Sequence, residues 1–334
     1  MYRLLYRTLC YDLQEVRKMG QLRQYAFELC RKKYGNTPPS ILIERLEYEL
    51  EDIEKKEHEQ AYLFAAQTYQ PLIKNHISFW ISGPVGCSFV AYLMGLTAVN
   101  PLPPHYYCPQ CRRVEMRLEK EDGFDLPACK CSTCGEFMIG DGHDLRFIWF
   151  SGEGESINPY FMEASTSPCG IRMLQEEPQN RSSHILALQS TQLAELEWLQ
   201  RNAGIKCFAI PIRELTAYPE WGGLSFCELI KKTAISHLTV KEAALLTPTE
   251  EELFFDRDAV LDYLTHNGLS EKEGFYWVEM IRRGKISYKP ETFRPFLERW
   301  GSHDFANAIS KVSGKILYLP SRSYTIAYLI SSLC

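Results

Sequence analysis

The chain has 334 residues, of which 45% are hydrophobic and 24% are charged, and its formal net charge is −5 at pH 7. This composition is typical of a folded protein with one large core or two modest ones, and it argues against a protein that coats nucleic acid through bulk positive charge. No apolar run approaches the roughly 18 residues of a membrane span, so no membrane partner is expected. Because there is no recognisable leader and the twelve cysteines show no disulfide rhythm, we expect a reducing, cytoplasmic setting.

Two helices are expected before residue 79. In the first, residues 1–34, apolar side chains such as Leu22, Tyr25 and Leu29 recur at helical spacing, and Gly35 ends the run. The second is expected to begin at Ser40, a good N-cap, and to continue to about residue 73. Its Glu and Lys side chains at i,i+4 spacing are expected on the exposed face of the helix.

A four-cysteine motif follows, with the spacing C-x2-C-x19-C-x2-C. Its members are Cys108, Cys111, Cys131 and Cys134. Two such CxxC turns bring four thiolates to one tetrahedral zinc ion, and sites of this kind are usually closed structural staples. Cys129 is an alternative third ligand, because it forms a C-x-C pair with Cys131. We prefer Cys131, which gives a regular C-S-T-C turn followed by Gly135.

The residues around this motif resemble a known family. The runs VGCSFVAYLMGLTAVNPLPPHYYCPQC and GFDLPACKCSTCG resemble the start of the palm and the zinc module of PolC-type DNA polymerase III alpha subunits of Gram-positive bacteria. The resemblance extends over residues 20–334 with one large deletion. The family's exonuclease, PHP, duplex-binding and clamp-binding parts have no counterpart in these residues.

The resemblance implies an α+β fold with three regions. Residues 1–78 are expected to be helical, residues 79–195 to form a reduced polymerase palm that includes a zinc module at 105–137, and residues 196–334 to be a mostly helical, fingers-like region. Within the last region, LSFCELIKKTAISHLTVKEAALL resembles a fingers segment of the family, and DRDAVLDYLTHNGLSEKEGFYWVEMIRRGK resembles its next pair of fingers helices.

The family's catalytic carboxylates have no equivalents in this chain. In the family, two Asp one residue apart on a strand bind two magnesium ions, and Ser156 and Asn158 stand in their place here. The third Asp lies on a strand that resembles HILALQSTQ, and the matching position is Gln189. Neutral Ser, Asn and Gln side chains are poor substitutes for anionic magnesium ligands. The resemblance therefore implies a pseudoenzyme.

The family's phosphate-gripping loop is also altered. Ser82 and Pro84 replace its Arg and Ser, and Pro84 has neither a hydroxyl nor an N–H to donate. The retained candidates for phosphate binding are Gly83, Gly86 and Ser88. Near the C-terminus, the family's Pro-Lys-x-His is not reproduced, although Arg322 could still meet a phosphate.

Three functions remain open at this stage. The first is a catalytically inactive relative that binds primer-template DNA or a replisome protein. The second is an active, magnesium-dependent nucleotidyltransferase that uses displaced carboxylates, with Glu153 and Glu155 as the main candidates and the pairs Asp141/Asp144 and Asp256/Asp258 nearby or later in the chain. The third is a zinc-stapled protein–protein interaction module, such as an inhibitor or decoy of a host polymerase.

Overall fold

The computed structural model describes residues 22–63, 65–66, 80–82, 84–151, 163–165, 171–174, 185–189, 206–210, 224–240, 253–282, 290–313 and 315–333. The chain divides into two compact units. Unit 1 comprises residues 1–227 and 326–334, and unit 2 comprises residues 228–325. None of the described helices is long and apolar enough to cross a membrane. The three regions expected from the sequence stay a prediction.

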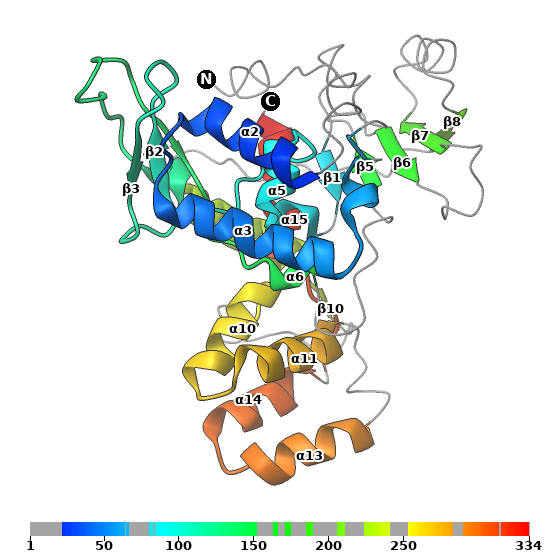
Figure 1. Ribbon diagram of the computed structural model, residues 1–334. Coiled ribbons are helices and arrows are strands. Elements are labelled where there is room, and N and C mark those ends of the chain that lie inside the picture. Colours follow the sequence, from blue (N-terminus) through cyan, green and yellow to red (C-terminus); the bar gives the residue numbers. More distant parts are fainter. Residues whose placement is uncertain are drawn as a thin grey trace. The chain divides into compact units, whose positions relative to one another are not determined.

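The described part of unit 1 starts with two neighbouring helices, α2 (Leu22–Tyr34) and α3 (Ser40–Lys55) (Figure 1). The predicted helix before Gly35 is confirmed over α2, and residues 1–21 lie outside the described part. The second helix begins at Ser40 as expected, but the cap residue is Pro39, without a side-chain capping bond. Its predicted continuation as one unbroken helix is wrong, although residues 59–63 and 65–66 are helical again, and residues 67–73 lie outside the described part. The helix ends at Lys55, because Glu57 takes a positive φ of 57° that an α-helix cannot accommodate.

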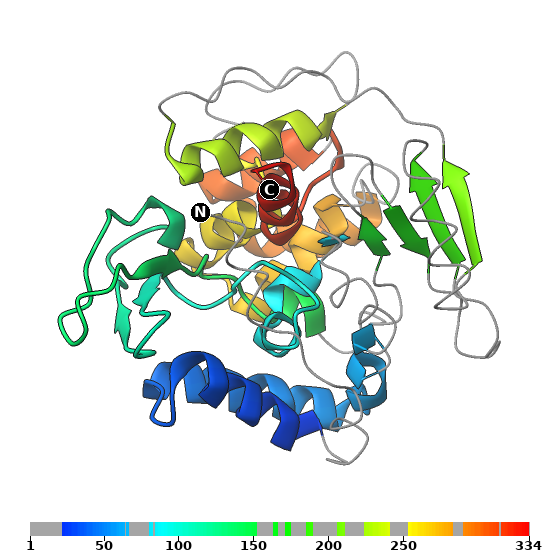
Figure 2. The same cartoon turned by 90° about the horizontal axis from the view of Figure 1, so that it is seen from above.

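A five-stranded sheet has the order β1 (Trp80–Ser82), β5 (Glu163–Ser165), β6 (Ile171–Leu174), β7 (Ile185–Gln189) and β8 (Lys206–Ile210). Neighbouring strands are antiparallel except β7 and β8, which are parallel and lie side by side in Figure 2. Strand β7 confirms the strand expected at HILALQSTQ. Strand β8 was not expected, because its five residues fall in a region predicted to be mostly helical.

A smaller sheet carries the cysteine motif. Its order is β3 (Val114–Met116), β2 (His105–Tyr107) and β4 (Ile139–Asp141), all antiparallel. The 3₁₀ helix η4 (Gly123–Asp125) packs on β4, and the Gly123 N–H donates a 2.7 Å hydrogen bond to the Gly142 carbonyl. A Cβ added at Gly123 would lie 2.0 Å from the Asp141 carbonyl oxygen. The two backbones therefore meet without an intervening side chain.

The turn predicted at residues 82–88 leads into a short helix, as expected. The 3₁₀ helix η3 (Pro84–Cys87) precedes α5 (Phe89–Leu93), and the Ser88 hydroxyl accepts a hydrogen bond from the Ala91 N–H as the N-cap of α5. Every side chain of α5 is buried, so α5 is a core helix of unit 1. Helix α6 (Ile148–Ser151) follows the small sheet and packs on η3.

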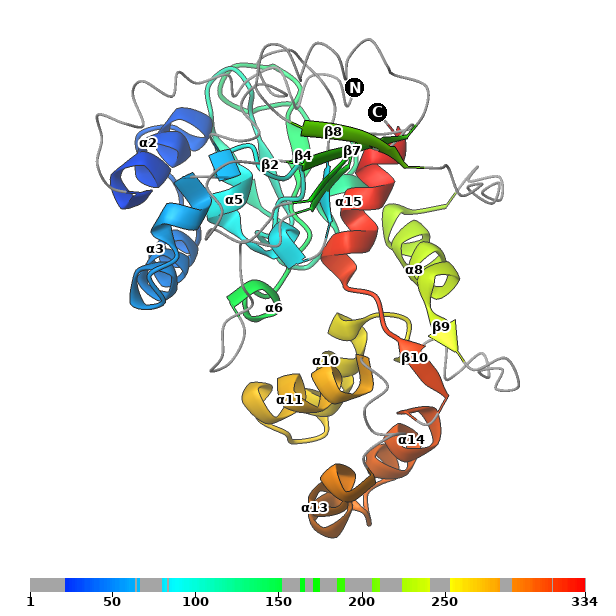
Figure 3. The ribbon, with the colours of Figure 1, turned by 90° about the vertical axis from the view of Figure 1, so that its right-hand side faces the viewer.

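Unit 2 is built from two helix pairs, α10 (Arg257–His266) with α11 (Glu271–Arg282) and α13 (Pro290–Trp300) with α14 (Asp304–Ser313) (Figure 3). Between α10 and α11, Gly268 has a φ of +97°, which suits glycine. A cluster of aromatic rings fills the core: Trp277, Phe293, Phe296 and Phe305. The predicted pair of fingers-like helices corresponds to α10 and α11.

Two helices cross the division between the units. Helix α8 (Phe226–His237) covers the first part of LSFCELIKKTAISHLTVKEAALL, whereas Thr239 and Val240 of the same run form a strand, which was not expected in a mostly helical region. Helix α15 (Arg322–Leu333) is the last described element. Strands β9 (Thr239–Val240) and β10 (Ile316–Tyr318) form an antiparallel pair within unit 2. The predicted mixture of helices and sheets is confirmed.

Candidate functional site

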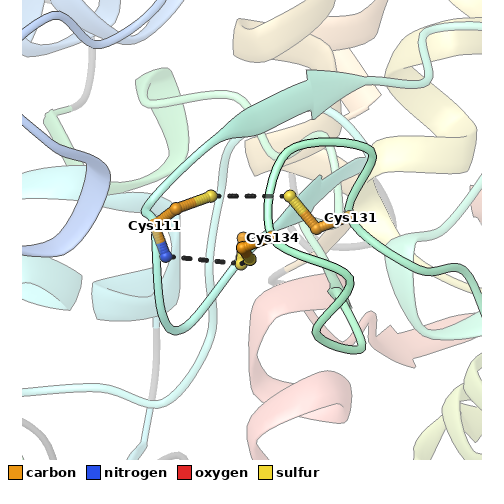
Figure 4. A group of neighbouring side chains, drawn as sticks. Cys111, Cys131 and Cys134 are labelled. Carbon is orange, nitrogen blue, oxygen red and sulfur yellow. Dashed lines mark hydrogen bonds between the residues drawn. The ribbon is translucent and has the colours of Figure 1, made fainter.

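The structure brings the four predicted cysteines together. The ligand sulfur atoms of Cys108, Cys111, Cys131 and Cys134 all lie within 4.8 Å of one another. The Cys111 and Cys131 sulfur atoms are 3.4 Å apart, as are those of Cys108 and Cys134. Figure 4 shows Cys111 and Cys131 pointing toward each other from two separate loops. A Zn–S bond of about 2.3 Å places tetrahedral sulfurs about 3.8 Å apart, so the cluster fits a zinc ion.

Each CxxC turn is closed by the same two backbone hydrogen bonds. In the first, the Arg112 N–H donates to the Cys108 carbonyl and the Cys108 N–H donates to the Arg113 carbonyl. In the second, Gly135 donates to Cys131, and Cys131 donates to Glu136. The residue after the second cysteine of each turn has a positive φ, 63° at Arg112 and 75° at Gly135. The two halves of the cluster are therefore local copies of one turn.

The turns also favour a thiolate. Backbone N–H groups of Cys134 and Thr133 lower the pKa of Cys131 to about 6. The backbone N–H of Arg113 acts in the same direction on Cys111, but burial and the shared proton with Cys131 raise the pKa of Cys111 to about 12. Cys131 is therefore the thiolate of this pair and can bind a cation, whereas Cys111 keeps its proton. A bound metal would displace that proton.

Cys129 is not a member of the cluster. Its sulfur lies 3.6 Å from the Lys130 carbonyl oxygen, and its side chain packs against the small core of the module formed by Tyr106, Cys108, Cys131 and Met138. The choice between Cys129 and Cys131 as the third ligand is thereby decided geometrically for Cys131.

A buried carboxylate meets the start of α5. Glu49 is fully buried and accepts hydrogen bonds from the Ser88 hydroxyl at 2.9 Å and from the backbone N–H groups of Phe89 and Val90 at 2.8 and 3.1 Å. The Arg45 guanidinium, 2.6 Å away on the same helix, neutralises it. The hydroxyl of Ser88, one of the predicted phosphate contacts, is therefore bonded to the protein's own carboxylate.

A second buried carboxylate lies at the end of β4. Asp141 accepts hydrogen bonds from the Tyr92 hydroxyl at 2.6 Å, the Asn100 amide at 2.9 Å and the Gly142 N–H at 2.9 Å. Although burial acts in the opposite direction, nearby Lys33 and two histidines lower the pKa of Asp141. Asp141 and Asp144 are the candidates for substitute metal ligands nearest to the cysteine motif in the sequence. Their side chains do not cluster with other ligands among the described residues, where the cysteine cluster is the only group of three or more candidate metal ligands.

A histidine–aspartate pair links the small sheet to η4. His143 is buried, and its Nδ1 lies 2.7 Å from Asp122 Oδ2. Burial lowers the pKa of His143, but the charge and hydrogen bond of Asp122 outweigh it, so the pKa is raised overall. The next acid, Asp125, accepts hydrogen bonds from the N–H groups of Phe226 and Cys227 at 2.5 and 3.0 Å. Thus η4 caps the first turn of α8.

Comparisons with known proteins show which proteins the first part of the chain is similar to. Residues 20–158 match the family model described as the bacterial DNA polymerase III alpha NTPase domain. Over 134 residues, the chain is 37% identical to the PolC-type DNA polymerase III of Staphylococcus saprophyticus, 39% to that of Pediococcus pentosaceus and 38% to that of Staphylococcus aureus. This segment is a PolC-like relative. Each match covers 40% of this chain and 9% of the relative.

The PolC-like segment contains most of the described site. It includes the cysteine cluster, Glu49 and Asp141, and it reaches residue 158. Ser156 and Asn158, which are predicted to replace the first two catalytic carboxylates, fall inside the match but outside the described residues, as do Glu153, Glu155 and Gly83. Their predicted roles stay predictions.

Three further predicted positions are described. Gly86 lies in η3, directly before Ser88 and α5. Gln189 is the last residue of β7 and pairs with Ile210 of β8 in the parallel register. Arg322 belongs to unit 2, where its guanidinium lies 2.8 Å from Asp256. Asp256 is completely buried and also caps α10 by accepting from the Ala259 N–H.

Proposed function

We propose that this chain is a catalytically inactive, PolC-like protein that binds DNA or a protein of the replication machinery. Its zinc module is a structural staple, and a reducing cytoplasm is its setting. The five-stranded sheet is the counterpart of a polymerase palm. The relatives' name supports a setting in DNA replication.

The observation that carries the proposal is that the described strands of the five-stranded sheet contain a single acidic residue. Its strands read WIS, EAS, IRML, ILALQ and KCFAI, so Glu163 is the one carboxylic acid among these described strand residues. Two-metal phosphoryl transfer needs several anionic ligands around both ions, because charge neutralisation supplies most of the rate enhancement. One acid cannot supply them.

The predicted replacement of the catalytic carboxylates by Ser156, Asn158 and Gln189 agrees with this argument. Gln189 ends the strand β7, and its neutral amide would leave a divalent ion without a charged partner. The contacts of the phosphate-binding candidates also support an inactive protein. Ser88 is bonded to Glu49, and Arg322 is paired with Asp256.

The zinc assignment rests on the donor set. Four sulfur ligands at mutual distances below 4.8 Å suit a soft, tetrahedral ion and leave no open coordination position for water. A bound zinc would hold the two CxxC turns together and stabilise the module. Its role in this proposal is to maintain the fold.

Primer extension tests the proposal. The purified chain is incubated with a labelled primer-template and deoxynucleotides in magnesium and, separately, in manganese. We expect no extension, together with a gel shift of the DNA that weakens as salt rises. Extension that disappears in the double variant Glu153→Gln/Glu155→Gln would instead establish an active enzyme with displaced carboxylates. Absence of a shift even at low salt would leave a protein partner as the ligand.

A further inference from the structure

Arg113 joins the two CxxC turns on their exposed side. Its Nη1 donates a 3.2 Å hydrogen bond to the Thr133 hydroxyl of the second turn, and its Nε lies 3.0 Å from Glu115 Oε1. The Arg113 side chain is 48% exposed, and Thr133 is exposed as well. Glu115 is shared, because the Arg117 guanidinium lies 3.0 Å from its other oxygen. The guanidinium of Arg113 therefore reaches from the first turn to the second and stays open to solvent.

An exposed aromatic ring follows the second turn. Phe137 is 56% exposed and pairs with Lys130 in an antiparallel β-bridge. The Lys130 Nζ lies 5.2 Å from the centroid of the Phe137 ring. Among the described residues, the small core of the module does not include Phe137. The ring therefore presents an apolar face to solvent, beside a positive charge.

These side chains belong to one closed piece of backbone. Thr133 lies inside the second turn, and Lys130 and Phe137 directly precede and follow residues 131–136, which backbone hydrogen bonds close into the turn. Arg113 contacts this turn through Thr133. Two cations, a hydroxyl and an aromatic ring are thus gathered at one end of the module.

We propose that this tip of the zinc module, formed by Arg113, Lys130, Thr133 and Phe137, binds single-stranded DNA. The guanidinium, ammonium and hydroxyl groups donate hydrogen bonds to phosphate oxygens, and an unpaired base stacks on the Phe137 ring. Proteins that hold single strands without sequence preference combine cations with exposed aromatic rings in this way. The inference rests on the proposed function and specifies where the DNA binds.

A purely structural role of the two cations is the alternative. Arg113 and Lys130 lie next to the cysteine turns, and a zinc ion bound by four thiolates is anionic overall, so both cations also offset the charge of such a centre. If this were their whole role, replacing them would lower the zinc content and replacing the uncharged Phe137 ring would have no effect on DNA binding. Phe137 therefore separates the two roles.

The test compares affinity and its salt dependence. Phe137→Ala is expected to weaken binding by about 5- to 150-fold, the effect of losing one base–aromatic stack, without changing the salt dependence, whereas Phe137→Trp should retain binding. Arg113→Gln and Lys130→Gln should each lower the slope of log affinity against log salt concentration by about 0.7, because each removes one phosphate contact.

Leu118→Ala and Lys120→Gln are the matched controls. Both residues are exposed and follow β3 at the His105 end of the small sheet, whereas Phe137 precedes β4 at the Tyr107 end. Both controls should bind like the wild type. Fluorescence anisotropy with the full, zinc-loaded chain and a labelled oligothymidylate measures binding, while atomic absorption and circular dichroism establish the zinc content and the fold of each variant.

The outcomes separate this inference from the proposed function. If the wild-type chain binds the oligonucleotide and Phe137→Ala binds equally well, the tip is not the site, while DNA binding by the chain stands. Loss of zinc from Arg113→Gln and Lys130→Gln, together with unchanged binding by Phe137→Ala, would establish the structural role instead. If the wild-type chain does not bind at low salt, both the tip and the DNA-binding form of the proposed function fail, and its protein-binding form stands.

Discussion

The Sγ atoms of Cys111 and Cys131 lie 3.4 Å apart although the two residues are twenty positions apart along the chain. Removal of one of these sulfurs should therefore open the module. We expect about one zinc per chain in the wild type and almost none in Cys131→Ser. Because structural zinc contributes about 10–16 kcal/mol of apparent binding free energy in small domains, the module is expected to unfold in this variant. Atomic absorption and thermal unfolding measure the two effects.

The matched control for this prediction is Cys129→Ser. Cys129 lies two residues before Cys131 but points to the Lys130 carbonyl and not to the cluster. Its replacement should leave the zinc content unchanged. A loss of zinc in Cys129→Ser, with retention in Cys131→Ser, would mean that the third ligand has been assigned to the wrong residue.

Glu49 ties α3 to α5, and Glu49→Gln should be strongly destabilising. The substitution leaves Arg45 without its carboxylate and places an amide against backbone N–H donors. Breaking a buried ion pair costs about 3–5 kcal/mol. Urea unfolding should show this loss, whereas Glu51→Gln, an exposed position on the same helix, should change stability by less than about 0.5 kcal/mol. Equal midpoints for the two variants would contradict a structural role for Glu49.

The His143–Asp122 pair should make stability depend on pH. A histidine whose pKa is raised in the folded state stabilises fully below its unfolded pKa, near 6.5, and this contribution is lost as pH rises through the folded value. Below pH 6.5, His143→Gln should lose the charged hydrogen bond, at a cost of about 1.5–3 kcal/mol. The difference from wild type should shrink as pH rises.

Differential scanning calorimetry across this pH range measures that difference. Burial lowers the pKa of His105, so His105 makes the folded state less stable at acid pH, which is opposite to the effect of His143. Each variant is therefore compared with the wild type at the same pH, because both proteins contain His105. The exposed His266→Gln variant serves as the control. A difference between His143→Gln and wild type that does not change with pH would show that His143 stays neutral.

Arg322 should matter for the stability of unit 2. Its guanidinium neutralises the buried Asp256, which also caps α10, so Arg322→Gln is expected to cost about 3 kcal/mol. Below the melting temperature, the folded variant should retain its affinity for DNA. A tenfold or greater loss of affinity with unchanged melting would instead establish the phosphate contact that the sequence suggested.

The cysteine cluster could be predicted from the sequence, because four ligands in two CxxC turns are specified by spacing alone. The register of its third ligand could not be decided in that way. Cys129 and Cys131 lie on the same short segment, so spacing favours Cys131 through its regular C-S-T-C turn, but the 3.4 Å distance between the Cys111 and Cys131 sulfur atoms is what shows that Cys131 faces the other turn. Strand β8 was missed because its sequence, KCFAI, is a short apolar run without alternation, and such a run fits a buried helical segment as well as a strand.

The burial of Glu49 was not predicted from the sequence, for a different reason. The spacing of Leu42, Leu46 and Ile53 continues through position 49, so the sequence did contain a sign that this acid lies on the apolar side of α3. We expected the charged residues of this helix on its exposed face, because the general pattern of i,i+4 pairs favours solvent. The partners that make burial of Glu49 possible, the N–H groups of α5, lie forty residues away and leave no local trace.

Gly123 and Gly140 lie where η4 and β4 meet backbone to backbone. A Cβ at Gly123 would fall 2.0 Å from the Asp141 carbonyl oxygen, and one at Gly140 would fall 2.4 Å from the Gly123 carbonyl oxygen. Each position therefore has room for a hydrogen atom and nothing larger. In a saturation library selected for soluble expression, we expect both sites to return glycine alone, while the exposed Lys120 and Glu121 beside them accept most side chains.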